Sequence, residues 1–162
     1  MAVWYEVEKT ATGMHDFMEC NWCFHDFVIE RETYFPQRGI VELFMKYDEL
    51  EGSVMLRFIG VKDFHFPAVD EAYSELSEAS LKLTETGDFI WLSEELYDDI
   101  EKVKETAAWV EAGSVLWAVT DDRGVPAEMP ENKLEQTWNV CGKIEQKHFS
   151  AKPFDGDNTC LE

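Results

Sequence analysis

Two cysteines stand beside a histidine and an aspartate in the stretch Cys20-Asn21-Trp22-Cys23-Phe24-His25-Asp26. Thiolate and imidazole groups are good zinc ligands, and a two-residue gap lets both sulfur atoms reach one ion. A closed zinc site needs four ligands, and no second Cys-x-x-Cys exists to supply the rest. The residues that could complete the site from a distance are His15, His65 and Cys141. Apolar neighbours, Met18 and Phe27 among them, favour small buried hydrophobic cysteines instead. We therefore predict structural cysteines with no metal and no other cofactor, and a zinc-stabilised module is the alternative.

The pairs His25-Asp26 and His15-Asp16 could serve a metal-assisted hydrolase, which would need further His and Asp ligands. The chain has only four histidines, and the residues after Cys23 alternate like a strand. A strand in that position also disfavours a thioredoxin-type redox site, which needs a helix there. The sequence contains no Gly-x-Ser-x-Gly, P-loop or Gly-x-Gly-x-x-Gly motif. We predict a protein that is not an enzyme. The alternative is a small metal-assisted hydrolase that uses the region of Cys20, Cys23, His25 and Asp26.

Charge is the most unusual property of this sequence of 162 residues. Its 34 acidic and 14 basic residues give a formal net charge of −20. This excess argues against binding to nucleic acid or to an anionic membrane surface, because both need clusters of Lys and Arg. Between Asp70 and Thr106 the sequence contains twelve acidic residues and only three lysines. Such a run is either a solvated face that keeps the protein soluble or a surface that meets a basic partner. The candidate partner-binding residues are Glu94, Glu95, Asp98, Asp99 and Glu101.

The length predicts one domain, over residues 1–150, followed by an irregular tail over 151–162 with few apolar groups. No apolar run approaches the roughly 18 residues of a membrane-spanning helix. The first residues lack the order of a signal peptide, so we expect a cytoplasmic protein with reduced cysteines. The oligomeric state is left open.

Alternating apolar residues between Phe24 and Phe66 predict three strands. They run from about Phe27 to Tyr34, from Ile40 to Tyr47 and from Val54 to Val61, with turns at 35–39 and 48–53. Short connections of this kind are typical of an antiparallel meander.

Glycine followed by a small polar residue and three apolar ones recurs further along the chain, and we interpret it as a hairpin turn. It predicts a hairpin of 80–85 with 89–92 and another of 107–111 with 115–120. A further turn is expected at 120–124. Ser93 is predicted to cap a helix with an apolar stripe of Leu96, Ile100, Val103 and Ala107. A second helix is expected over about 131–147.

The predicted fold class is α+β, mainly an antiparallel β-sheet of meanders and hairpins with one or two helices. Trp91 and Trp117 are expected to be buried. The other predicted core residues are Ile29, Leu43, Met45, Leu56, Phe58, Ile90, Leu96, Ile100 and Leu116.

The three predicted strands resemble those of small, uncharacterised bacterial proteins, some of which are classed as immunity proteins. The likeness rests on a strand with the pattern [FL]-H-D-x-x-[IV] that is followed by two further strands. In this sequence the three runs are Phe24–Glu30, Val41–Asp48 and Leu56–Val61. The resemblance implies a cytosolic, non-enzymatic protein that binds and neutralises a cognate toxin, and it lends no catalytic residues. The charge favours the same class, because toxin domains that attack nucleic acid are often basic. We therefore expect the partner to be a basic toxin domain, and we expect charge reversal at Asp98 and Asp99 to weaken binding without unfolding the protein.

Overall fold

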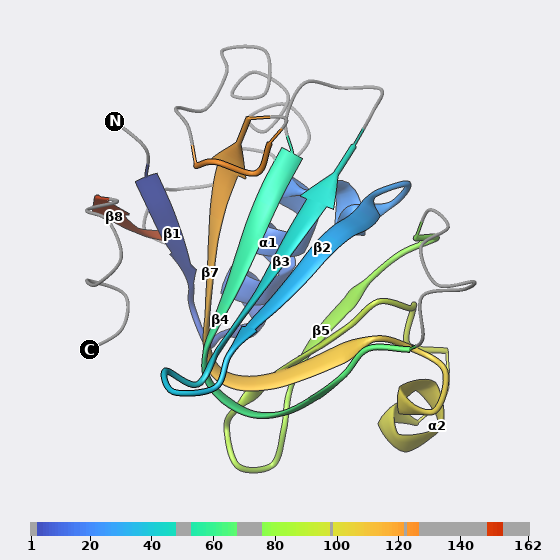
Figure 1. Ribbon diagram of the computed structural model, residues 1–162. Helices are drawn as coiled ribbons and strands as arrows, with labels where there is room; N and C mark the ends of the chain where they lie inside the picture. The colour runs from blue at the N-terminus through green and yellow to red at the C-terminus, as the bar shows by residue number, and fades with distance from the viewer. Residues whose placement is uncertain are drawn as a thin grey trace.

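The computed structural model describes residues 3–47, 53–67, 76–97, 99–121, 123–126 and 149–153. They form the predicted α+β fold, a mainly antiparallel sheet with two helices (Figure 1). The predicted meander is confirmed as β2 (Val28–Phe35), β3 (Ile40–Lys46) and β4 (Ser53–His65), each paired antiparallel with the next. Among the described helices, none combines the length and the apolar character needed to cross a membrane.

The centre of the sheet is the long antiparallel pair of β4 and β7 (Trp109–Thr120), and both strands bend strongly in Figure 1. The hairpin predicted between residues 107–111 and 115–120 is therefore wrong, since residues 109–120 form one continuous strand, β7. Gly113 does not turn the chain, because β7 stays paired with β4 on both sides of it. A positive φ occurs instead at Gly60 on β4, where φ is +67°. A Cβ atom added at Gly60 would lie 3.8 Å from the Gly113 Cα, so the two glycines meet where the pair bends.

The edge of β7 that faces away from β4 is shared between two partners. Its first half pairs with β6 (Phe89–Leu92), which forms the predicted hairpin with β5 (Ser80–Leu83), and its second half pairs with β1 (Val3–Val7). On the other side of β1 lies β8 (Phe149–Pro153). Residues 151–153 were expected in the irregular tail and instead belong to this strand, while residues 154–162 lie outside the described part. The predicted turn at 120–124 is present, with the Gly124 N–H donating to the Asp121 carbonyl.

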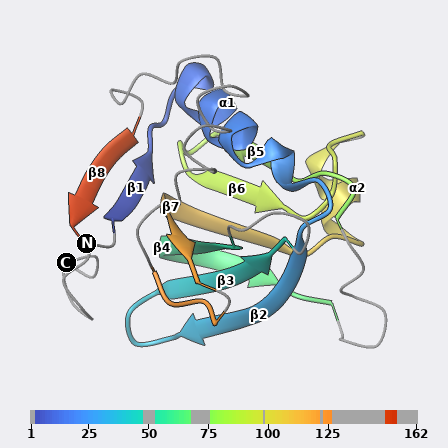
Figure 2. The same ribbon diagram turned by 90° about the horizontal axis from the view of Figure 1, so that it is seen from above.

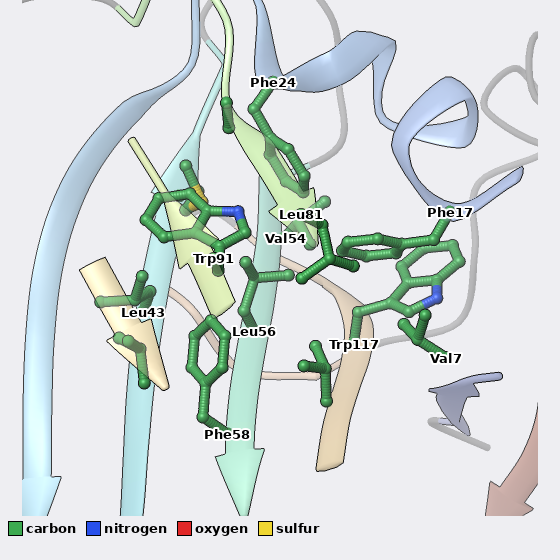
Figure 3. Packing of buried hydrophobic residues seen from close by; sticks show 14 of the residues in the cluster. Val7, Phe17, Phe24, Leu43, Val54, Leu56, Phe58, Leu81, Trp91 and Trp117 are labelled. Atoms are coloured by element: carbon green, nitrogen blue, oxygen red, sulfur yellow. The ribbon is translucent and has the colours of Figure 1, made fainter. Parts of the chain in front are cut away.

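Helix α1 (Ala11–Cys20), which sequence analysis did not predict, lies over one face of the sheet and leads into the short helix η1 (Trp22–Phe24) (Figure 2). The Thr10 side chain caps it by accepting a hydrogen bond of 2.9 Å from the Gly13 N–H. Phe17 of α1 packs against Trp117, and their ring centroids are 6.2 Å apart (Figure 3). Helix α1 thus closes the main core.

The main core confirms the expected burial of both indoles, with Trp91 0% and Trp117 2% exposed. Trp91 lies among aromatic rings, 6.3 Å from Phe24 and 6.2 Å from Phe58 between centroids (Figure 3). The other predicted core residues are also buried, except for two that are partly buried against a separate cluster, Leu96 and Ile100.

Helix α2 is shorter than predicted and covers only Ile100–Lys104. Ser93 does not cap it, because the Ser93 hydroxyl accepts a hydrogen bond of 2.9 Å from the Ala108 N–H. The cap is Asp99, whose carboxylate accepts from the Lys102 N–H at 2.9 Å. The predicted apolar stripe nevertheless packs inward, with Val103 and Ala107 buried. The helix predicted over 131–147 lies outside the described residues.

Candidate functional site

The predicted partner-binding residues all fall in one excursion of the chain between β6 and β7, which we call the acidic segment (residues 94–107). Its two ends meet, because the Ser93 N–H donates to the Ala108 carbonyl and the Ala108 N–H donates to the Ser93 hydroxyl, both at 2.9 Å. Val103 and Ala107 anchor its second half in an apolar cluster with β6. The acidic segment is therefore a loop with a fixed base rather than the single helix that we expected.

Within the acidic segment the structure separates carboxylates that face solvent from those used inside the fold. Glu95 is exposed, and the Glu101 side chain is 84% exposed and forms an ion pair of 3.8 Å with Lys104. Glu94 is half-buried, and its carboxylate accepts a hydrogen bond of 3.2 Å from the Thr106 hydroxyl. Asp98 lies outside the described residues.

Asp99 is exposed, but its carboxylate caps α2, which changes what a substitution there would do. Charge reversal at this position would remove the cap as well as the charge, and loss of a cap costs about 1 kcal/mol. Charge reversal at Asp99 is therefore expected to lower the stability of the fold as well as to change its surface charge. Glu95 and Glu101 are the positions at which charge can be changed with least effect on structure.

A pocket of about 380 Å³ opens beside the acidic segment, between α1 and β5. Its apolar lining comes from Met14, Met18, Leu81 and Leu96. Charged and polar groups complete the lining, and they include His15, Glu19, Cys23, Lys82 and Glu95. The pocket was not predicted from the sequence, because one of its walls is α1, a helix that was not predicted either. A helical spacing of Met14, Phe17 and Met18 was the available signal.

Negative charge gathers at this pocket. Burial raises the pKa of the Cys23 thiol above its ordinary value, and the nearby carboxylates of Glu19 and Glu78 raise it further. Both effects disfavour the thiolate, so Cys23 is a poor nucleophile at neutral pH. The same field that destabilises an anion at the sulfur stabilises a cation placed beside it.

The structure puts the two cysteines in different surroundings. Cys20 is 4% exposed in the core side of α1, whereas Cys23 is half-buried and lines the pocket. Cys23 lies in a left-handed turn, with φ of 52°. Across the described ranges, no three His, Cys, Asp or Glu side chains are grouped in a way that could hold a metal ion.

His25 and Asp26 contact each other rather than a shared pocket. The His25 Nδ1 atom lies 3.0 Å from the Asp26 Oδ2 atom, and the two side chains are 57% and 43% exposed. His15 lines the pocket beside α1, while neither His25 nor Asp26 is among that pocket's described lining residues. The structure therefore shows a contact between two largely solvent-facing side chains at this position.

Three comparisons with known proteins complete the description of the site. No protein family model, no curated protein and no solved structure matches this chain.

Proposed function

We propose that the protein acts by binding a basic protein partner, and that it is an immunity protein that neutralises a basic toxin domain in the cytoplasm. The observation that carries this proposal is the acidic segment, a loop with a fixed base that turns Glu95 and Glu101 to solvent. A net charge of −20 adds a long-range attraction for a basic partner.

An exposed aromatic side chain supports an interaction surface at the same place. Tyr97 is 69% exposed, and it stands between Glu95 and the helix cap Asp99. Tyrosine is enriched in protein interfaces because its ring buries a large apolar area while its hydroxyl keeps a hydrogen-bond partner. An acidic loop with a projecting tyrosine is thus complementary to a basic surface with an apolar centre.

The restricted conformation of the acidic segment also favours binding. The hydrogen bonds at its base and the packing of Val103 and Ala107 restrict the segment before any partner arrives. Preordered groups lose less conformational entropy on association, so more of the interaction energy appears as affinity.

Co-purification from the source cell together with the product of the neighbouring gene tests this function. We expect recovery of a basic protein that is released as salt rises, because salt screens charges at an exposed interface. The double variant Glu95→Lys/Glu101→Lys should lose the partner, whereas the control Glu30→Lys, an exposed residue on β2, should retain it. A captured partner that ignores both salt and the double variant would contradict the site, and a neighbour without a toxin-like domain would contradict the immunity role.

The alternative function, a metal-assisted hydrolase or a zinc-stabilised module, requires Cys20, Cys23, His25 and Asp26 to act together. The separation of buried Cys20 from the exposed His25–Asp26 pair gives that alternative no specific support. Metal analysis of protein purified without chelator tests it directly. Stoichiometric zinc that is lost in Cys20→Ser or Cys23→Ser would replace our proposal with a zinc-stabilised module.

A further inference from the structure

We propose that the pocket between α1 and β5 receives one arginine or lysine side chain of the basic partner. This inference rests on the proposed function and names the group that would anchor the complex. It assigns a role to a cavity that the acidic segment alone does not explain.

The shape and lining of the pocket fit a long cationic side chain. Its volume of about 380 Å³ is within the range of small-ligand pockets. Met14, Met18 and Leu96 offer apolar surface to a chain of methylene groups, while Glu19 and Glu95 offer carboxylates to a charged head. Arginine and lysine combine such a stem with such a head, and arginine is the commoner interface anchor.

The electrostatics of the pocket favour a cation over an anion or a neutral group. Burial raises the pKa of the Cys23 thiol most, and the nearby carboxylates of Glu19 and Glu78 raise it further, as negative charge beside the lining would. Lys82 is the opposing charge among the described lining residues. Removing a carboxylate and removing this ammonium should therefore change cation binding in opposite directions.

The position of the pocket connects it to the proposed interface. Glu95 and Leu96 line the pocket and also lie near the start of the acidic segment, so a partner lying on Glu95 and Tyr97 would reach the opening. Side chains that fill pockets at the centre of an interface usually dominate its affinity, while surrounding charges steer the approach.

Binding of a blocked arginine, N-acetyl-arginine methylamide, tests the pocket without the partner. Methyl NMR signals of the methionines report it, because Met14 and Met18 line the pocket, whereas Met45 and Met55 are buried elsewhere and serve as internal controls. We expect saturable shifts at Met14 and Met18 only, and weaker shifts with neutral N-acetyl-norleucine methylamide, which carries an apolar stem without the charge.

Charge variants sharpen this test. Glu19→Gln should weaken arginine binding by about two- to fivefold and Lys82→Gln should strengthen it by a similar factor, as expected for partly exposed ion pairs. Glu85→Gln, an exposed residue of the β5–β6 turn, is the matched control and should leave binding unchanged. Equal binding of the two probes, absence of saturable shifts, or insensitivity to both Glu19→Gln and Lys82→Gln would overturn the proposal.

The outcomes separate this inference from the proposed function. If a basic partner binds with steep salt dependence but neither the blocked arginine nor Glu19→Gln has an effect, the pocket proposal is wrong and the function stands. If the blocked arginine binds as described but no basic partner is recovered, the pocket proposal stands and the function is wrong.

Discussion

Charged side chains on the sheet and on the acidic segment are used in opposite ways. On the sheet, the Arg57 Nη2 atom lies 2.8 Å from the Glu42 Oε1 atom, and the guanidinium lies 4.3 Å from the centre of the Trp4 ring. The Arg57 and Glu42 side chains are only 12% and 18% exposed, so each supplies the other with an oppositely charged hydrogen-bond partner inside the fold. On the acidic segment, Glu101 is 84% exposed. The comparison indicates which charges hold this fold together and which face solvent.

The largest effect on stability is expected where the core is packed by indole rings. Trp91→Ala or Trp117→Ala should destabilise the protein by about 3–5 kcal/mol, because each removes a fully buried side chain and leaves a cavity. Tyr97→Ala on the acidic segment is the control, and it should change the free energy of unfolding by less than about 0.5 kcal/mol. Urea denaturation measures both, and similar losses at Trp91 and Tyr97 would contradict the comparison.

A smaller loss is expected when a paired charge on the sheet is removed. Arg57→Met should cost about 1–3 kcal/mol, because Glu42 then keeps a half-buried carboxylate without its hydrogen-bond donor. Arg123→Met makes the same chemical change at an exposed ion pair with Asp121 and should cost less than about 0.5 kcal/mol. Thermal or urea unfolding measures the loss of stability in each variant. Equal losses would mean that burial does not determine how much these ion pairs stabilise the protein.

Within the acidic segment itself, two neighbouring carboxylates should behave differently. Asp99→Ala should lower the free energy of unfolding by about 1 kcal/mol, because the Lys102 N–H loses its cap. Glu101→Ala should have an effect below about 0.5 kcal/mol. Chemical denaturation of the two variants tests this difference, and an unchanged stability in Asp99→Ala would show that the cap does not support the loop.

The pH dependence of stability should carry a small contribution from Asp88. Hydrogen bonds from Lys62 and Thr86 hold the pKa of the Asp88 carboxyl below its ordinary value of 3.8. The unfolded chain therefore takes up this proton at a higher pH than the native protein does, so the contribution is present above about pH 4 and is lost as the pH falls through the lowered native pKa. Urea midpoints measured between neutral and acidic pH should fall less steeply in Asp88→Asn; an identical slope would contradict this role.

The sequence predicted the sheet best where each strand carries its own pattern. Strands β2, β3 and β4 carry an alternating pattern of apolar residues, and the β5–β6 hairpin is marked by a glycine turn. Local sequence is therefore enough to predict these elements. The hairpin wrongly predicted at Gly113 shows where local sequence is not enough. Gly113 lies inside β7 because Gly60 approaches it from β4, and this contact joins residues more than fifty positions apart in the sequence.

Helix α1 was missed for a related reason. Gly13 disfavours a helix by its intrinsic propensity, yet a Cβ atom there would lie 2.8 Å from the Glu8 carbonyl oxygen, so the path of the chain just before the helix requires glycine. The pocket beside α1 could not be predicted without that helix. Composition located the run of acidic residues, but the cap of its helix was assigned to Ser93 because both Ser93 and Asp99 are good capping residues.

The association rate with the recovered basic partner, measured over a range of salt concentrations, tests the central claim most directly. We predict fast association that slows steeply as salt rises, because exposed charges steer the encounter and are screened over about 8 Å at physiological ionic strength. The variant Glu95→Lys/Glu101→Lys should associate at least about tenfold more slowly at low salt and show a much weaker salt dependence. Equal rates and equal salt dependence in the two proteins would contradict the claim that the acidic segment is the binding surface.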